Sequence, residues 1–90
     1  MTRAPIYTRQ FEKDIRRVRK RGKNLEKLKP VLALVIDGQS LPTNYRDHPL
    51  RGNYVGRREC HIEPDWLLIY TLRTDAVIFE CTGSHADLFE

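Results

Sequence analysis

The sequence predicts an α+β protein in which a short strand and a helical hairpin pack on a small antiparallel sheet, in the order β-α-α-β-β-β. Three observations predict this fold. Apolar residues recur at helical spacing in the first forty residues, three strand-like runs fill the last forty, and a proline-containing loop separates the two halves. Ninety residues are expected to form a single domain, residues 1–90, because domains span about 50 to 250 residues.

The first helix is expected to follow a short strand at residues 6–7. Thr8 is a suitable N-cap because its hydroxyl can accept a hydrogen bond from a free backbone N–H. Basic residues fill the last turns, where the helix dipole favours positive charge, and Gly22 ends the helix. Apolar residues recur every three or four positions along one face: Phe11, Ile15 and Val18.

A second helix is predicted between Asn24, its expected cap, and residues 37–38. Pro30 falls inside this range, and a proline within a helix removes a hydrogen bond and clashes with the preceding turn. Two solutions are open: the helix bends at Pro30, or its regular part begins near Lys29. Either way, a turn at residues 22–23 joins two amphipathic helices into an αα-hairpin.

The second half is predicted to contain a long loop followed by three antiparallel strands. The loop covers residues 39–53, and its prolines are expected to prevent regular pairing through most of it. The strands are expected at residues 54–62, 66–72 and 76–82, joined by tight turns, with a short tail after residue 83. Strand alternation places Arg57, Glu59 and His61 on one face of the first strand, and Arg58, Cys60 and Ile62 on the other.

Charge is distributed unevenly along the chain. Residues 1–30 contain eleven Lys/Arg and three Asp/Glu, whereas residues 31–90 contain five and nine, so balances of +8 and −4 give the net charge of +4. This asymmetry predicts that the first third faces a polyanion or an acidic protein, since clustered positive charge attracts both. A solvated basic helix face without a partner is the alternative.

Neither a membrane nor an oxidising compartment is indicated. No apolar run approaches the roughly 18 residues of a membrane span, and the N-terminus lacks the apolar stretch of a secretory signal. We therefore expect a cytoplasmic protein. Cys60 and Cys81 are 21 residues apart, which matches no zinc or redox spacing, and a free cysteine is most often a small core residue.

The three histidines, His48, His61 and His85, all lie in the second half, and Asp65 closely follows the middle one. An imidazole with its ordinary pKa of about 6.5 can give or accept a proton near neutral pH. Cleavage of RNA through its 2′-hydroxyl needs a base, an acid for the leaving oxygen and positive charge at the phosphorane. These residues could supply all three without a metal, or they could be ordinary surface and turn residues.

Three segments of the second half resemble, in order and spacing, the YafQ-type toxins of the RelE/ParE superfamily. The segments are Asp47-His48-Pro49-Leu50, His61-Ile62-Glu63-Pro64-Asp65-Trp66 and Thr82-Gly83-Ser84-His85-Ala86-Asp87-Leu88-Phe89. The resemblance covers nearly the whole chain and implies the RelE-like fold. It also implies a toxin of a type II toxin–antitoxin system, namely a ribosome-dependent mRNA endonuclease that needs no metal or other cofactor.

The resemblance assigns the functional positions of the family to residues of this chain. It implies catalytic roles for His48, His61, Asp65 and His85, and contributions to activity from Trp66 and Phe89. It also implies attack of a ribose 2′-hydroxyl on the adjacent phosphate, leaving a cyclic phosphate and a 5′-hydroxyl. One position departs from the pattern. Cys81 stands where the family commonly has an arginine that is thought to stabilise the phosphorane.

The chemistry of the side chains suggests a role for each catalytic candidate. We expect His48 to be the base and His85 the acid, with His61 against the phosphate as an imidazolium. Asp65 would orient a neighbouring imidazole, although an exchange of roles between His48 and Asp65 is open. The charge missing at Cys81 could come from an arginine nearby in sequence, with Arg57 the first choice because it shares a strand face with His61. The candidates are Arg51, Arg57 and Arg58.

The resemblance also implies two macromolecular partners. Basic residues of the first helix would neutralise rRNA phosphates around the decoding site, while the pocket reads the mRNA. These residues are Arg16, Arg17, Lys20 and Arg21. A small antitoxin would cover the same basic surfaces with an acidic or amphipathic segment, in a 2:2 or larger complex. The open alternatives are a non-catalytic ribosome- or nucleic-acid-binding relative and a zinc enzyme, although histidine spacings of 13 and 24 match no local zinc motif.

Overall fold

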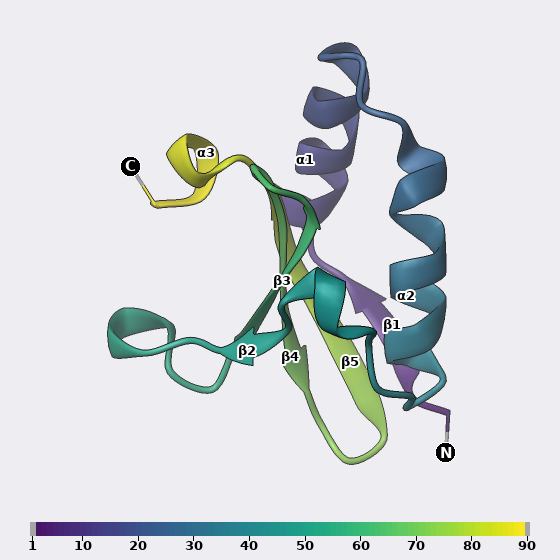
Figure 1. The fold of residues 1–90 in the computed structure, drawn as a ribbon. Helices are drawn as coiled ribbons and strands as arrows, with labels where there is room; N and C mark the ends of the chain where they lie inside the picture. Colours follow the sequence, from purple (N-terminus) through teal and green to yellow (C-terminus); the bar gives the residue numbers. More distant parts are fainter. Residues whose placement is uncertain (1, 90) are drawn as a thin grey trace.

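The computed structural model describes residues 2–89, which form a five-stranded sheet with two helices, α1 and α2, on one face (Figure 1). The strand order is β1-β5-β4-β3-β2. The strands are β1 (Ala4–Tyr7), β2 (His48–Pro49), β3 (Arg58–Glu63), β4 (Trp66–Leu72) and β5 (Ala76–Gly83). The predicted α+β class and the predicted meander of three antiparallel strands are confirmed.

The predicted short first strand is present as β1, but its parallel pairing with β5 was not predicted. It pairs with β5 in parallel, with Ala4 opposite Ala76 and Tyr7 opposite Phe79, whereas the other three strand pairs are antiparallel. The helical hairpin between β1 and the rest of the sheet supplies the crossover that a parallel pair requires. The short first strand therefore becomes the outer edge of the sheet.

The helices begin and end where local chemistry predicts. Helix α1 covers Arg9–Lys20, and the hydroxyl of Thr8 accepts a hydrogen bond of 2.9 Å from the backbone N–H of Phe11. A 3₁₀ turn at Leu25–Lys27 then precedes α2, which covers Lys29–Ile36 and holds Pro30 in its first turn. Proline is tolerated there because its missing N–H would have no partner. Of the two solutions for Pro30, the later helix start is therefore correct.

The long loop and the tail contain more structure than predicted. A 3₁₀ turn covers Thr43–Tyr45, and β2 pairs with β3 at the sheet edge, where proline is tolerated. Strand β3 begins four residues later than predicted because a 3₁₀ turn at Gly52–Tyr54 and a positive φ of 90° at Gly56 interrupt the extended chain. The predicted tail contains the short helix α3 (His85–Phe89). No helix among residues 2–89 is long and apolar enough to cross a membrane.

The hydrophobic core fills the space between the helices and one face of the sheet. Strand β4 is buried along Trp66–Tyr70. The rings of Tyr7, Phe11 and Phe79 lie 5.5–5.8 Å apart and join β1, α1 and β5. The other core residues are Val18, Leu28, Val31, Val35, Cys60, Leu68 and Val77. This packing holds the central strands rigidly beneath the loops that follow them.

A buried carboxylate connects α1 to the end of β5. The side chain of Asp14 is 2% exposed, and its Oδ2 accepts a hydrogen bond of 3.1 Å from the backbone N–H of Thr82. Its Oδ1 accepts from Gln10 Nε2 at 2.8 Å and from Arg17 Nη2 at 3.0 Å. Asp14 therefore fixes the position of α1 along the last residues of β5. Its carboxylate also lies near the N-terminus of α1, where the helix dipole favours negative charge.

We expect Asp14→Ala to lower the free energy of unfolding by about 2–4 kcal/mol, because it leaves the buried N–H of Thr82 without its charged acceptor. Urea denaturation followed by circular dichroism measures this change. Lys13→Ala, at an exposed neighbouring position of the same helix, should change the value by no more than about 0.5 kcal/mol. Equal stabilities for the Asp14→Ala and Lys13→Ala proteins would contradict the role assigned to the buried carboxylate.

Candidate active site

The three histidines meet at one end of the sheet, although they come from three separate elements. His48 lies in β2, His61 in β3 and His85 at the start of α3. The ring centroids of His48 and His61 are 6.2 Å apart, and those of His61 and His85 are 6.0 Å apart. Three imidazoles at this spacing can surround a single phosphodiester group. The structure thus brings together the residues that the sequence analysis selected for catalysis.

A buried carboxylate, Glu59, lies between two of these imidazoles. Its Oε1 is 3.5 Å from His48 Nε2 and 3.2 Å from His61 Nε2, and its side chain is 7% exposed. The pairing of β2 with β3 places His48 directly opposite Glu59, and the two-residue period of β3 places His61 on the same face. Glu59 was not among the predicted site residues, although strand alternation had placed it beside His61.

Backbone carbonyls orient both imidazoles toward Glu59. His48 Nδ1 lies 2.7 Å from the carbonyl oxygen of Arg46, and His61 Nδ1 lies 3.4 Å from that of Pro64. A carbonyl oxygen can only accept, so each Nδ1 carries a hydrogen and each Nε2 is the nitrogen that faces the carboxylate. Arg46 adopts a left-handed conformation with φ of 50°, a strained geometry that aims its carbonyl at the ring of His48.

Asp65 holds His85 through two hydrogen bonds. Its Oδ1 accepts from the backbone N–H of His85 at 2.9 Å and contacts His85 Nδ1 at 2.7 Å. These contacts, the backbone hydrogen bond above all, lower the pKa of Asp65, so the carboxylate is ionised at neutral pH. The ionised acceptor places the hydrogen on Nδ1 of His85 and leaves Nε2 free to act on a substrate. The predicted orienting contact between Asp65 and an imidazole is therefore present.

Helix α3, which carries His85, is attached to α1 by a second carboxylate. Asp87 Oδ2 accepts from the backbone N–H of Ser84 at 2.9 Å, and the Ser84 hydroxyl accepts from the N–H of Asp87 at 3.1 Å. Arg21 contacts both oxygens of Asp87, at 2.5 and 3.0 Å, and these hydrogen bonds hold the pKa of Asp87 well below its ordinary value. A Cβ at Gly83 would lie 2.8 Å from Asp87 Oδ2, so this close packing requires glycine.

Two of the four predicted ribosome-binding residues thus have internal partners. Arg21 binds Asp87, and Arg17 binds Asp14 at 3.0 Å and lies 3.8 Å from Asp87. Arg16 and Lys20 are exposed on the same helix and have no ion pair within residues 2–89. The basic face of α1 therefore contains residues that stabilise the site as well as residues that are free to meet an external anion.

The two aromatic candidates differ in exposure. Trp66 is 1% exposed and donates a hydrogen bond of 3.0 Å from Nε1 to Thr82 Oγ1, so its ring offers no face to a nucleobase. The structure gives no support for the predicted substrate contact by Trp66, because the indole fills the core. Phe89 is 39% exposed, and its ring centroid lies 6.3 Å from that of His85. Tyr54 packs edge-on against Phe89 at 5.3 Å, a contact that the sequence analysis missed.

The three arginines predicted to supply the charge missing at Cys81 lie in different places. Arg57 is half-exposed, lies 3.7 Å from Glu80 and sits over the ring of Tyr54, on the sheet face that carries His61. Arg51 is exposed at the start of the turn that precedes β3. Arg58 points to the opposite face, as alternation predicted. Burial raises the pKa of the Cys81 thiol to about 11, so Cys81 supplies no charge of its own.

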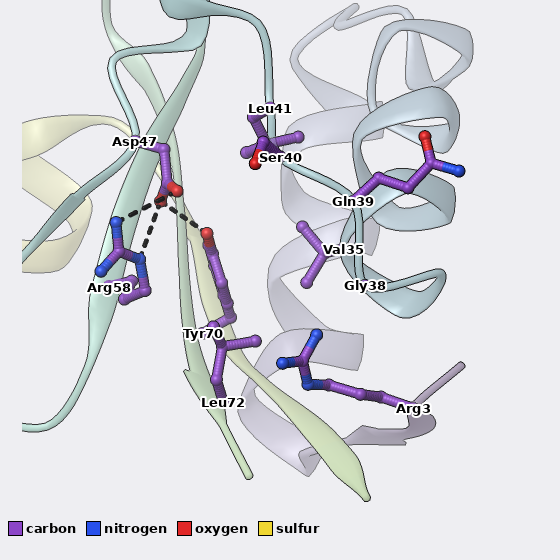
Figure 2. A pocket seen from close by; sticks show the side chains of 10 residues that line it. All are labelled: Arg3, Val35, Gly38, Gln39, Ser40, Leu41, Asp47, Arg58, Tyr70 and Leu72. Carbon is purple, nitrogen blue, oxygen red and sulfur yellow. Dashed lines mark hydrogen bonds and ion pairs between the residues drawn. The ribbon is translucent and has the colours of Figure 1, made fainter. Parts of the chain in front are cut away.

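Arg58 instead anchors the loop that carries His48. Asp47 Oδ1 accepts from the Tyr70 hydroxyl at 2.5 Å and from Arg58 Nε at 3.2 Å, and its Oδ2 accepts from Arg58 Nη2 at 3.2 Å (Figure 2). These residues border a cavity of about 190 Å³ beneath the 39–47 loop. The anchor fixes the backbone directly before His48. The predicted contact of Arg58 with substrate is therefore not supported, because its guanidinium is occupied by Asp47.

The chain is similar to known toxins over almost its full length. Residues 3–90 match the family described as a bacterial toxin of type II toxin–antitoxin systems, YafQ. The mRNA interferase toxin YafQ of Escherichia coli K12 is 46% identical over 84 residues, which cover 92% of this chain and 91% of that relative. The crystal structure of the E. coli DinJ-YafQ toxin–antitoxin complex contains a chain with 44% identity and a TM-score of 0.93, and the match covers 100% of both chains.

A metal-bound toxin from Helicobacter pylori is also similar, with 34% identity and a TM-score of 0.90 over 99% of this chain and 100% of that one. The fold and these matches define a bacterial toxin of the type II toxin–antitoxin class. The chain belongs to the YafQ family. The resemblance seen in its histidine-containing segments is therefore confirmed.

The ion pair of Asp87 should make stability depend on pH. A carboxyl whose pKa is lowered by folding contributes stability that is complete above its unfolded pKa, and this stability is lost as the pH falls toward the folded value. We expect the free energy of unfolding, measured in urea, to decrease between about pH 5 and pH 2 more steeply in the wild type than in Asp87→Asn. Asp75→Asn, in an exposed turn, should retain the wild-type slope. Parallel slopes for the wild type and Asp87→Asn would contradict this role.

Proposed function

We propose that this toxin cuts mRNA on the ribosome by metal-independent acid–base catalysis, with His48, His61, Asp65 and His85 in the catalytic centre. The chain is an mRNA interferase, the class of endoribonuclease to which its 46% identical relative belongs. The observation that carries the mechanism is the meeting of three imidazoles around two carboxylates, Glu59 and Asp65. Such a centre can remove one proton and deliver another without a metal ion.

His48 removes the proton of the attacking 2′-hydroxyl. Its side chain is 47% exposed, so a ribose can approach Nε2, and the carbonyl of Arg46 fixes the ring orientation. Proton uptake converts the ring to an imidazolium, and Glu59 at 3.5 Å stabilises that charge. His61, closer to Glu59 at 3.2 Å, is the imidazolium that faces the phosphorane. Asp65 is a poor base because its pKa is lowered, so the observations favour His48 over Asp65 for this step.

His85 donates a proton to the departing 5′-oxygen. Its contact with Asp65 directs Nδ1 away from the substrate, so the proton leaves from Nε2. The product pair is then a 2′,3′-cyclic phosphate and a 5′-hydroxyl. Phe89, exposed beside His85 and braced by Tyr54, would stack on a base next to the cut. The arginines that would contact the phosphate in place of the family arginine are Arg57 and Arg51, which lie close to His48 and His61 in the sequence.

Two partners complete the proposal. Exposed cations of α1, Arg16 and Lys20, would bind rRNA phosphates and so position the catalytic centre over mRNA in the decoding site, which places the activity in the cytoplasm. A cognate antitoxin is supported by the DinJ-YafQ complex, in which a chain that matches this one along its full length is bound to an antitoxin. A 2:2 or larger assembly and an acidic antitoxin segment are further parts of the proposal.

We expect His85→Ala to lower the single-turnover rate of mRNA cleavage on programmed ribosomes by about 10²- to 10⁴-fold, the usual contribution of a positioned acid. Mapping of 5′ ends with and without 1,10-phenanthroline, which binds transition metals and leaves the Mg²⁺ of the ribosome in place, should show codon-phased cuts that survive chelation in the wild type and disappear in the variant. Asp65→Asn keeps the ring in place and should cost less. Cleavage of free RNA at the same rate would contradict ribosome dependence, and wild-type binding without cleavage would indicate a non-catalytic relative.

The ribosome contact predicts a change in salt dependence. We expect the double substitution Arg16→Ala and Lys20→Ala to weaken ribosome binding and to reduce the slope of log Kd against log salt by about 1.4–1.8, since each phosphate contact contributes about 0.7–0.9. Fluorescence anisotropy of labelled toxin measures both quantities. Arg73→Ala removes a positive charge from the exposed β4–β5 turn, away from α1, and should leave the slope unchanged. An unchanged slope for the double variant would exclude α1 as the binding surface.

A further inference from the structure

We propose that Glu63 is a positioning residue for RNA cleavage, which acts by fixing the turn between β3 and β4 to the helical hairpin. Its Oε1 accepts a hydrogen bond of 2.8 Å from Lys23 Nζ, and its Oε2 accepts one of 2.9 Å from Lys27 Nζ. We call these three side chains the Glu63 clamp. This role rests on the proposed function, because the turn that the clamp holds contacts two of the proposed catalytic imidazoles.

The two residues that follow Glu63 supply the groups that orient His61 and His85. The carbonyl oxygen of Pro64 lies 3.4 Å from Nδ1 of His61. The carboxylate of Asp65 contacts the backbone N–H of His85 at 2.9 Å and its Nδ1 at 2.7 Å. A movement of this turn would therefore displace the partners of both rings at once, and a misplacement of about 1 Å can lower a rate by about 10²-fold.

The backbone that leads into this turn is not held by a regular ladder. The pairing of β3 with β4 is in register from Arg58 to His61, but it shifts between His61 and Glu63. Such an irregularity leaves a residue unpaired and bends the strand. Pro64 has no N–H to donate, and both Pro64 and Asp65 are exposed. The position of the turn therefore depends on side-chain contacts, and those of Glu63 connect it to the helices.

Both lysines of the clamp extend from a well-anchored part of the hairpin. The backbone N–H of Lys23 donates to the carbonyl oxygen of Val18 at 3.1 Å, just after the end of α1. That of Lys27 donates to the carbonyl oxygen of Asn24 at 3.0 Å, in the 3₁₀ turn that Asn24 caps. Since α1 is itself fixed to β5 through Asp14, the hairpin is a firm support for the turn.

The clamp fixes a local position more than it stabilises the whole fold. Each oxygen of Glu63 has its own ammonium group, so the carboxylate is held in both position and rotation. The hydrogen bonds from Lys23 and Lys27 lower the pKa of Glu63, which is therefore ionised at neutral pH. The three side chains are 24–55% exposed, and ion pairs at such exposure contribute little to the free energy of unfolding. Loss of the clamp should therefore disturb the proposed catalytic centre in a protein that stays folded.

The positioning is tested without RNA by NMR spectroscopy of the imidazole nitrogens in the ¹⁵N-labelled toxin. We expect Glu63→Gln, which keeps the shape of the side chain but removes its charge, to shift the ring signals of His61 and His85. Glu26→Gln is the matched control, because it breaks an exposed ion pair of 2.9 Å with Lys29 in the same hairpin and should leave both signals in place. Ring signals that stay unchanged in Glu63→Gln would overturn the proposal.

The effect on catalysis is tested by single-turnover cleavage on programmed ribosomes at saturating toxin. We expect Glu63→Gln to lower the rate by about 10- to 100-fold while the Tm and the Kd for ribosomes stay near those of the wild type. Glu26→Gln should cut at the wild-type rate. A lower Tm or weaker binding of Glu63→Gln, with an unchanged rate at saturation, would overturn the positioning role.

Removal of the clamp from the helical side provides a second, independent variant. Lys23→Met combined with Lys27→Met breaks the same two hydrogen bonds and should lower the saturated rate as much as Glu63→Gln does. The three substitutions together should lower it no further, because they remove one shared interaction. Additive losses would show that the side chains act separately and would overturn the clamp. A wild type that cuts no RNA would instead contradict the proposed function, and the imidazole signals would still test the positioning.

Discussion

The hydrogen bond from the Thr82 backbone to the buried Asp14 determines how the two halves of the molecule meet. It fixes α1 against the end of β5, one residue before Gly83 and three before His85. The same carboxylate holds Arg17, which approaches Asp87 on α3. The position of the proposed acid is therefore set from inside the core, through a charged group that water cannot replace. Ion pairs therefore connect the basic helix α1 to the end of the sheet that carries the proposed catalytic residues.

The parts of this fold that the sequence predicts are those set by interactions between residues close together in the chain. The cap at Thr8, the apolar period of α1 and the tight turns around β4 are all short-range features, and the predicted elements agree with them. The parallel pairing of β1 with β5 depends on where the chain returns after the 68 residues between them, residues 8–75, which no local pattern encodes. The late start of β3 arises from Gly56, whose positive φ becomes evident only within the folded loop.

The candidate site likewise contains residues that the sequence identifies and residues that only the structure identifies. Reactive side chains can be recognised by type, so the sequence alone points to His48, His61, Asp65 and His85, and the structure places these residues together. Supporting residues are harder to recognise because their importance comes from contacts across the sheet. Glu59 and Asp47 are ordinary acidic residues in the sequence, yet one lies between two imidazoles and the other anchors the loop before His48. Trp66 is the opposite case, because the sequence analysis expected it to contribute to activity whereas its large side chain is buried in the core.

The bidentate pair between Arg21 and Asp87 has a consequence for work at high ionic strength. Arg21 is about half-exposed, so dissolved ions screen its attraction to Asp87 and compete for both charges. Concentrated salt, which is the usual means of stripping a basic protein from RNA, would therefore also loosen the helix that carries His85. A loss of activity under such buffers would combine two effects, detachment from RNA and disorganisation of the proposed catalytic centre. Comparison with a neutral osmolyte of equal osmolality would separate them.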